Sequence, residues 1–335
     1  MRHWKRITFV ILGSGFLFCS IAAGVNFLVD PLWSFDHEVP IGRYQPMFDE
    51  RQQKTNWVAF RKVEYDTIIL GNSRVTYLDT RVVPGKAFNY SASSMKPVEY
   101  LPYMKFVSSR SSMPIKTVVL GMSFADTNGS NAPSFEKPET YISRTRSFGY
   151  RLKPLFNSNI LRYSLGCIRR DIHGNVHNAY IRQGREVVSK QMVLPVPESE
   201  LQKESADNLE TYRKNVYGRS YTYQDNKEIY RALRTAFPDV KFYIFTTPVT
   251  DHLLKLLVEE GRLNDYERWI TDLVDVFGEV WHFMYFNSVT GNDENFKDAH
   301  HYSPRIAEVI VRKLFGLETE KNYDDFGMKI SAESL

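Results

Sequence analysis

A run of 23 residues without a charge, Ile7–Val29, constrains this chain more than any other feature of its sequence. As an α-helix rising about 1.5 Å per residue, it reaches roughly 34 Å, enough to cross a hydrocarbon core of about 30 Å. A cleaved signal peptide is the alternative, with Ser20-Ile21-Ala22 as a small-x-small cleavage site. Because the run is longer than a usual signal core and continues past that site, we expect an uncleaved membrane anchor.

The charges on either side of this run predict its orientation. Three basic residues precede it and three acidic residues follow it: Arg2, Lys5, Arg6, Asp30, Asp36 and Glu38. Positive charges stay on the cytoplasmic side of a membrane, so the N-terminus is expected there and the rest of the chain is exported. In a bacterium this describes a single-pass protein of the inner (cytoplasmic) membrane, with a C-terminal domain that is periplasmic or extracellular.

The exported part is nearly neutral and rich enough in apolar residues to fold. The whole chain has 43 Lys+Arg and 39 Asp+Glu, and without the three basic residues at its start 40 and 39 remain. Nucleic-acid-binding proteins usually carry a strong basic surplus, so we expect no nucleic-acid partner. A hydrophobic fraction of 43% excludes wholesale disorder. Cys19 and Cys167 cannot form a disulfide framework.

Short apolar runs alternate with segments of helical spacing after the anchor. Strand patterns occur at 67–70, 86–89, 117–120, 240–245 and 280–283, and helical patterns at 96–108, 253–260, 266–277 and 303–314. This alternation predicts an α/β fold in which a parallel sheet is covered on both faces, giving a three-layer α/β/α arrangement.

The same patterns suggest four parts. We expect the cytoplasmic tip and anchor at 1–30, a proline-containing linker at 31–63, the α/β domain at 64–316 and a C-terminal tail at 317–335. The domain contains a long insertion at about 127–239, because the distance between its third and fourth strands is too great for a simple crossover. Between Lys137 and Lys190 there are eleven Lys/Arg and three acidic residues, with tyrosines interleaved. Such a segment suits a substrate-facing surface, a face on anionic lipid or a solvated helical cap.

Polar motifs follow the predicted strands, where chemistry is found in parallel sheets. Gly71-Asn72-Ser73-Arg74 follows the first strand, Asn89-Tyr90-Ser91-Ala92-Ser93-Ser94 the second and Gly121-Met122-Ser123-Phe124 the third. Asp298-Ala299-His300-His301-Tyr302 precedes the last helix. In this order the motifs resemble those of the SGNH/GDSL hydrolase superfamily, over about residues 64–316.

More narrowly, the chain resembles the membrane-anchored, exported SGNH-like proteins found with bacterial polysaccharide O-acylation systems. A GxSR serine turn and a late Asn-Phe-x-Asp-x-x-His stretch, here Asn295 to His301, recur in that group. The resemblance implies an SGNH-like, flavodoxin-like fold without a cofactor. It also implies a serine esterase or O-acyltransferase acting on acyl esters, acetyl above all, of a cell-envelope polysaccharide. A membrane O-acyltransferase is the partner it suggests.

The resemblance assigns the catalytic roles to three residues. A serine hydroxyl is a poor nucleophile until a neighbouring base takes its proton. Ser73 would be that nucleophile, His301 the general base, and Asp298, three residues before it, the group that orients the imidazole. His300 competes with His301 for the role of base.

The expected oxyanion donors depart from the family pattern. These donors are the Ser73 backbone N–H, a backbone N–H after the second strand and a side chain after the third strand. Ser94 stands where the family commonly has glycine, and Ser123 where it has asparagine. Asn89, at the end of the second strand, is a further binding candidate. Arg74 would contact an anionic substrate group or anchor its loop by a salt bridge.

Three other functions stay open at this point. The weakened oxyanion hole favours a non-enzymatic scaffold that binds glycan or a membrane partner. A phosphoesterase or lipase could use the same triad. A metal site could be formed from Asp298, His300, His301 and His282, because imidazole and carboxylate are good ligands, but nothing fixes a third ligand at a diagnostic spacing and we expect no metal.

Overall fold

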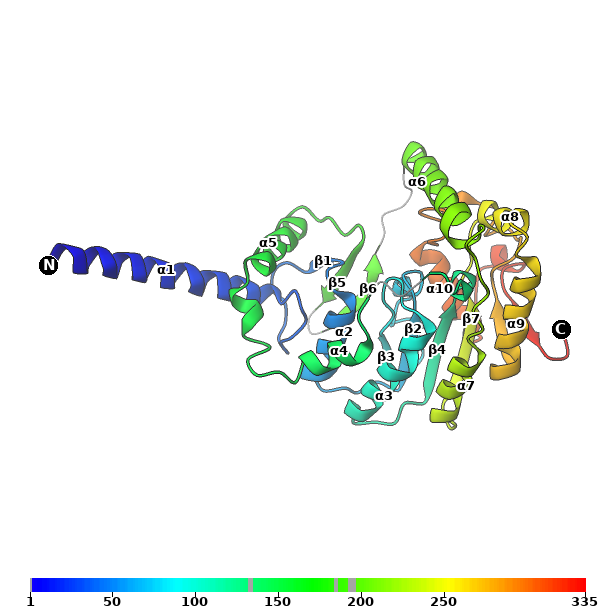
Figure 1. Cartoon of the computed structure of the whole chain (residues 1–335), viewed down its shortest axis with the longest axis horizontal. Coiled ribbons are helices and arrows are strands. Elements are labelled where there is room, and N and C mark those ends of the chain that lie inside the picture. Colours follow the sequence, from blue (N-terminus) through cyan, green and yellow to red (C-terminus); the bar gives the residue numbers. More distant parts are fainter. Residues whose placement is uncertain (1, 132–134, 184–185, 192–196) are drawn as a thin grey trace. The chain divides into compact units, whose positions relative to one another are not determined.

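The computed structural model forms two compact units, drawn in sequence colours in Figure 1. It describes residues 2–131, 135–183, 186–191 and 197–335. Unit 1 comprises Met1–Arg61 and Glu139–Val188, and unit 2 comprises Lys62–Pro138 and Ser189–Leu335. The chain therefore leaves unit 1, builds the first part of unit 2, and returns to unit 1 before completing unit 2.

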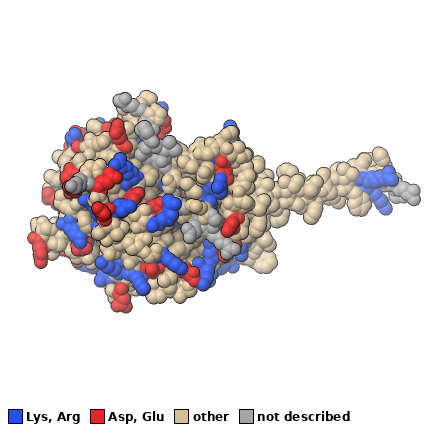
Figure 2. Space-filling model, turned by 180° about the vertical axis from the view of Figure 1, so that it is seen from behind, with Lys and Arg blue, Asp and Glu red and all other residues tan. Residues whose placement is uncertain are grey.

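Helix α1 (Arg2–Val29) is long and apolar enough to span a membrane from His3 to Val29. Figure 2 shows it as an uncharged shaft with basic side chains only near its free end. Its last turn belongs to unit 1, because the Asn26 amide donates to the carbonyls of Pro154 and Leu155, at 3.3 and 2.9 Å. The side-chain oxygen of Asn26, Oδ1, also accepts a hydrogen bond from the Ser164 hydroxyl at 2.8 Å.

Unit 1 combines short strands with helices that come from both of its segments. They are β1 (Tyr44–Pro46), α2 (Glu50–Phe60), α4 (Pro138–Arg144), η4 (Lys153–Phe156), α5 (Ser158–Ile172), β5 (Ala179–Gln183) and β6 (Glu186–Gln191). The strands form a three-stranded sheet in the order β1-β5-β6, with β1 antiparallel to β5. This antiparallel pairing joins the two segments of unit 1.

Most of residues 31–63, expected to be a linker, belongs instead to unit 1, which extends to Arg61. Asp49 caps α2 by accepting a hydrogen bond from the Gln52 N–H at 3.1 Å, and the polar side chains of this helix are buried. Asp30, which directly follows α1, lies 3.5 Å from the Arg61 guanidinium and 3.6 Å from that of Arg182. The sequence is polar like a linker, but Gln52, Gln53 and Asn56 of α2 form hydrogen bonds inside the unit.

Unit 2 contains a mostly parallel six-stranded sheet, which confirms the predicted α/β class. In spatial order its strands are β3 (Ala87–Asn89), β2 (Thr67–Gly71), β4 (Thr117–Met122), β7 (Lys241–Thr246), β8 (Glu279–His282) and β9 (Met328–Ser331). The first five run parallel, and β9 pairs antiparallel with β8. The expected tail at 317–335 therefore supplies an edge strand, which its charged sequence does not indicate.

Helices pack on both faces of this sheet. The helices of the unit are α3 (Tyr100–Arg110), α6 (Glu198–Thr211), α7 (Lys227–Ala236), α8 (Asp251–Glu259), α9 (Leu263–Phe277) and α10 (Pro304–Leu314). On one face α7 lies between α3 and α9. The last part of the expected insertion, which contains α7, therefore belongs to the helix layer on that face. On the other face α10 packs on Ile69, Val119 and Phe245. The Ser303 hydroxyl caps α10, as predicted, by accepting from the Ile306 N–H.

The strand order places the serine turn, Gly71-Asn72-Ser73-Arg74, at a switch point of the sheet. The chain passes from β2 to β3 on one side and then returns to β4 on the other, and ligands bind beyond strand ends at such points. Gly71 and Gly121 are register partners here. A Cβ on Gly121 would lie 2.3 Å from Val75 Cγ2, so glycine lets Val75 pack onto the sheet and hold the turn close to it.

Candidate active site

Three residues of unit 2 form a hydrogen-bonded array beyond the carboxyl end of β2. Ser73 Oγ lies 2.8 Å from His301 Nε2, and His301 Nδ1 lies 2.7 Å from Asp298 Oδ2. A carboxylate only accepts hydrogen bonds, so Nδ1 carries the proton and Nε2 is free to accept the one from Ser73. The structure thus brings together the three residues that the sequence motifs suggested as a catalytic set.

The loop before α10 fixes the Asp298 carboxylate firmly. Its Oδ1 accepts the backbone N–H groups of His300 and His301, each at 2.9 Å. Burial alone would raise the pKa of Asp298, but the adjacent imidazoles of His301 and His300 hold it well below its usual range. Asp298 is therefore ionised at neutral pH and able to orient His301.

His300, the competing base, lies beside the array: its Nδ1 is 3.4 Å from Asp298 Oδ1, but it is His301 that contacts Ser73. The ring of His300 lies against Tyr212, with the ring centroids 5.4 Å apart, and its backbone carbonyl accepts a hydrogen bond from Arg74. Burial lowers the pKa of His300 well below its ordinary value, so this imidazole stays neutral. It lines the cavity beside Ser73 but does not replace His301 in the array.

Arg74 links three segments of the site from a position that is 4% exposed. Its guanidinium donates to the His300 carbonyl at 2.9 Å, to Ser123 Oγ at 2.5 Å and to the Tyr212 hydroxyl at 2.5 Å. These bonds anchor the serine turn to the histidine loop, to the end of β4 and to the turn after α6. Of the two roles suggested for Arg74, the structure shows the anchoring one, through neutral acceptors rather than a salt bridge.

A cavity of about 210 Å³ lies beside Ser73. Its lining is mostly polar and includes Asn72, Arg74, Ser94, Lys96, Asp126, Asn131, Tyr212 and His300. Asp126 accepts from Lys96 Nζ at 3.2 Å and from the Asn72 amide at 3.3 Å. Burial raises the pKa of Asp126, while Lys96 and Arg74 act against that rise. The cavity has room for a short acyl group next to a polar acceptor.

Two backbone N–H groups are available as oxyanion donors. Ser73 and Ser94 both line the cavity, and neither backbone N–H donates a hydrogen bond to the part of the chain that the structure describes. Ser94 has φ 53°, a left-handed backbone conformation that favours glycine over serine.

The side chains of Ser123 and Asn89 form hydrogen bonds elsewhere and do not act as oxyanion donors in the cavity beside Ser73. The Ser123 hydroxyl accepts from Arg74 and is absent from the described cavity lining. Its short side chain stays behind the guanidinium, where a longer asparagine would reach further. The Asn89 amide donates to the carbonyls of Val75 and Leu78, at 2.9 and 3.2 Å. Asn89 thus supports the 3₁₀ turn η1 (Val75–Tyr77) that follows Ser73.

The sequence motifs did not reveal three residues of this site. Tyr212 comes from η5 (Tyr212–Val216), and no local pattern links that turn to a serine 139 positions earlier. Lys96 and Asp126 follow β3 and β4, so the rule that chemistry gathers beyond strand ends could have found them. In these two segments the sequence motifs pointed only to Ser94 and Ser123.

The metal alternative involves the same histidine loop. Ligand atoms of Asp298, His300 and His301 lie within 4.8 Å of one another. His282 is not part of this group, because its ring nitrogens lie 3.0 Å from Thr246 Oγ1 and 3.2 Å from the Tyr266 hydroxyl. A metal ligand at His301 would have to break the bond to Asp298 or to Ser73, so the geometry favours the triad.

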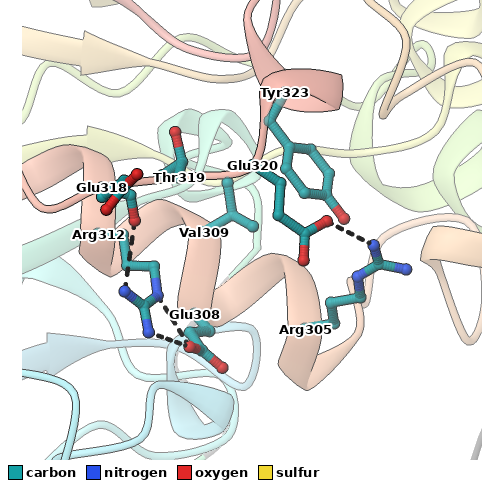
Figure 3. A pocket seen from close by; sticks show the side chains of 8 residues that line it. All are labelled: Arg305, Glu308, Val309, Arg312, Glu318, Thr319, Glu320 and Tyr323. Carbon is teal, nitrogen blue, oxygen red and sulfur yellow. Dashed lines mark hydrogen bonds and ion pairs between the residues drawn. The ribbon is translucent and has the colours of Figure 1, made fainter.

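A second cavity of unit 2, about 400 Å³ in volume, lies along α10 (Figure 3). Its charged side chains are paired, with Arg305 3.2 Å from Glu320 and Arg312 2.8 Å from Glu308. None of its lining residues belongs to the triad. This cavity therefore offers no comparable chemistry.

Comparison with models of known protein families and with characterised proteins found no match for this chain. Its chemistry has to be inferred from the residues of the site. Of these, the array of Ser73, His301 and Asp298 is the most specific feature.

Proposed function

We propose that this protein is a membrane-anchored SGNH-type serine esterase or O-acyltransferase. The observation that carries the proposal is the continuous array Asp298–His301–Ser73, with links of 2.7 and 2.8 Å. A serine, an imidazole and an ionised carboxylate in this geometry form the arrangement that activates serine for acyl transfer on several unrelated folds.

The reaction begins at the ester carbonyl. Ser73 Oγ bonds to the carbonyl carbon while its proton passes to His301 Nε2, and Asp298 stabilises the imidazolium that forms. The negative charge on the carbonyl oxygen is met by the N–H groups of Ser73 and Ser94. When the intermediate collapses, the bond to the alkoxy oxygen breaks and His301 returns the proton to it. The alcohol leaves, and the acyl group remains on Ser73.

A second alcohol or a water molecule then completes the cycle. His301 takes its proton, its oxygen attacks the acyl carbon, and Ser73 leaves with the proton returned by His301. Water as acceptor gives hydrolysis, whereas a sugar hydroxyl gives transfer. The resemblance to proteins of polysaccharide O-acylation systems favours transfer, with a membrane O-acyltransferase as the source of the acyl group.

The cavity supports a small acyl group and a polar acceptor. With a volume of about 210 Å³ and a lining that includes Lys96, Asp126 and Asn131, it differs from the deep apolar trench that a lipid chain needs. We assign the substrate to acetyl or similarly short esters of a cell-envelope polysaccharide. Helix α1 would anchor the chain in the bacterial inner membrane, with both units exported.

A non-enzymatic scaffold is the second candidate, and one observation favours it. Ser123, in place of the family's asparagine, is bonded to Arg74, so the third oxyanion donor is missing from the described cavity lining. Loss of one such donor costs acyl-transfer enzymes about 10²–10³ in kcat. A scaffold would keep the cavity as a glycan-binding site without turnover.

Serine labelling separates these two functions. The full-length chain in detergent micelles is treated with a fluorophosphonate probe and, separately, with p-nitrophenyl acetate. Truncation at residue 31 is avoided because Asn26 and Val29 are buried in unit 1. We expect labelling and acetate release by the native chain and by Ser108→Ala, a matched variant of an exposed serine on α3.

Both signals should vanish in Ser73→Ala and fall steeply in His301→Ala but not in His252→Ala, which removes an exposed histidine. Folded native protein that neither labels nor releases acetate, with oligosaccharide present or absent, would reject the enzyme and favour the scaffold. Labelling that persists in Ser73→Ala would place the nucleophile elsewhere.

A further inference from the structure

Unit 1 exposes large apolar side chains where α1 enters it. Phe148 is 99% exposed, Phe156 65% and Leu152 60%, and Phe27 and Leu28 on α1 itself are exposed by 40% and 43%. We call these five residues the collar. Single exposed apolar residues are ordinary on protein surfaces, but a group of this size marks a surface that something covers.

Hydrogen bonds fix the position of the collar relative to α1. The Asn26 amide bonds to the Pro154 and Leu155 carbonyls, which lie between Leu152 and Phe156 in the chain. Phe27 and Leu28 follow Asn26 directly. In Figure 1 the segment between α4 and α5 lies at the edge of unit 1 from which α1 emerges. Leu152 and Phe156 therefore lie close to the last turn of α1, and Phe148 precedes them on the same segment.

The length of α1 places this turn at a membrane boundary. The uncharged residues before Asn26, from Ile7 to Val25, number 19 and extend about 28 Å along a helix. That is close to the thickness of a hydrocarbon core, about 30 Å. If Lys5 and Arg6 lie at one surface, Asn26 lies at the other, and apolar side chains beside it meet the region between headgroups and acyl chains.

The charges around the collar select the kind of lipid. Residues 139–175 contain seven Lys/Arg and two Asp/Glu, and one of the acids, Asp171, is paired with Arg43 at 2.9 Å. Arg146 and Lys153 are exposed next to collar residues. Basic residues interleaved with exposed aromatic and leucine side chains are typical of surfaces that bind anionic membranes.

Helix α5 continues the same pattern. Its outward-facing residues at helical spacing are Arg162, Leu165, Arg169 and Ile172, with Leu165 and Ile172 exposed by 52% and 71%. Its opposite side buries Ser164 and Cys167. A solvated cap would carry polar residues at Leu165 and Ile172, so this stripe favours contact with lipid rather than with water.

We propose that the collar lies in the anionic lipid surface of the membrane that α1 spans, so that unit 1 is seated on the bilayer rather than tethered above it. This inference rests on the membrane anchoring proposed above and is independent of the chemistry at Ser73. We propose that lipid covers the collar. The test below would reveal a protein partner if that were the covering surface instead.

The experiment measures lipid contact at single cysteines of the full-length chain in nanodiscs. Cysteine is introduced as Phe148→Cys, Leu152→Cys or Phe156→Cys in a background with Cys19→Ser and Cys167→Ala, and is labelled with the environment-sensitive dye NBD. Ser143→Cys on α4 is the matched control, because Ser143 is exposed and Figure 1 shows α4 further along the direction in which α1 enters unit 1. A separate chain that keeps Cys19, on the exposed surface of α1, and carries only Cys167→Ala reports the anchor itself.

We expect NBD at Cys19 and at the collar positions to be blue-shifted and quenched by doxyl-labelled lipid, and NBD at Ser143→Cys to be quenched only by aqueous iodide. Quenching at the collar should increase from phosphatidylcholine discs to discs containing phosphatidylglycerol. Equal quenching in both would overturn the role of the basic residues.

The controls separate failure of this inference from failure of the proposed anchor. If Cys19 reports lipid while the collar behaves like Ser143→Cys, the collar does not touch the bilayer, and a protein partner must cover it. If Cys19 itself reports water, α1 does not span the membrane and both inferences fall. Neither result bears on labelling of Ser73.

Discussion

Replacing Arg74 with methionine tests whether this buried cation holds the site together. Methionine has a similar length but no hydrogen-bond donor, so Arg74→Met removes all three bonds, to the His300 carbonyl, Ser123 and Tyr212. The serine turn would lose its connection to the histidine loop, and the distance from Ser73 to His301 would no longer be fixed.

The expected size of the effect follows from these contacts. Hydrogen bonds to a charged group are each worth about 1.5–3 kcal/mol, so three give a gross loss of roughly 4–9 kcal/mol. Part of this is recovered, because a buried guanidinium no longer has to be desolvated. We expect the free energy of unfolding to fall by about 3–5 kcal/mol, because three acceptors lose their donor and each buried polar group left unsatisfied costs about 1–3 kcal/mol. The free energy of unfolding of Arg74→Lys should lie between those of the native chain and Arg74→Met, because one ammonium group cannot reach three acceptors.

Urea unfolding of the full chain in micelles and hydrolysis of p-nitrophenyl acetate provide the readouts. The matched control is Arg305→Met, which removes an arginine of the same unit that is 64% exposed and pairs with Glu320. Such surface pairs contribute about 0–1 kcal/mol. If Arg74→Met were as stable as Arg305→Met and kept its kcat, Arg74 would not hold the site together.

Three further predictions concern neighbouring positions. Gly121→Ala should lower the free energy of unfolding by about 1–3 kcal/mol and impair fluorophosphonate labelling, because its Cβ would displace the serine turn. The control is Gly166→Ala, which should change neither quantity because a Cβ there meets nothing within 4 Å. Ser94→Gly should keep activity and raise the free energy of unfolding by up to about 1 kcal/mol, because it relieves a φ of 53°, and a loss of activity would argue for the hydroxyl. Asp298→Asn should lower kcat by about 10⁴-fold by failing to hold the His301 tautomer. The pKa of Asp298 is depressed in the folded state, so the ionised carboxylate stabilises the fold. The difference in free energy of unfolding between the native chain and Asp298→Asn should therefore be complete above about pH 4 and shrink as the pH falls. A difference that grows in acid would refute this.

The sheet could be predicted because its signals are local, whereas the three residues of the array were suggested by the resemblance of their motifs to those of a known family. The runs at 67–70 and 117–120 are apolar and end at a glycine, and both are buried strands in the structure. Asp298 and His301 are three residues apart in a tight loop before α10, so short-range geometry alone brings them together. Ser73 joins them because parallel strands end at one edge of the sheet.

The remaining features depend on contacts that no local pattern reports. Tyr212 reaches Arg74 only through the fold, and Ser123 is an acceptor because a guanidinium lies in front of it. Residues 31–63 have a linker's composition, yet the polar side chains of α2 are buried, and Tyr180 from a distant segment donates a hydrogen bond to Glu50. Burial of polar groups depends on such partners, which hydropathy alone does not reveal.

The interleaved course of the chain has a consequence for the order in which the protein is made. Unit 1 cannot close when its first segment leaves the ribosome, because Asn26 bonds to Ser164, 138 residues later, and β1 pairs with β5. By then β2, β3 and β4 have been synthesised, but their sheet still lacks β7, β8 and β9. Unit 1 can therefore be completed first, whereas the serine turn has no His301 to pair with until the last tenth of the chain is made.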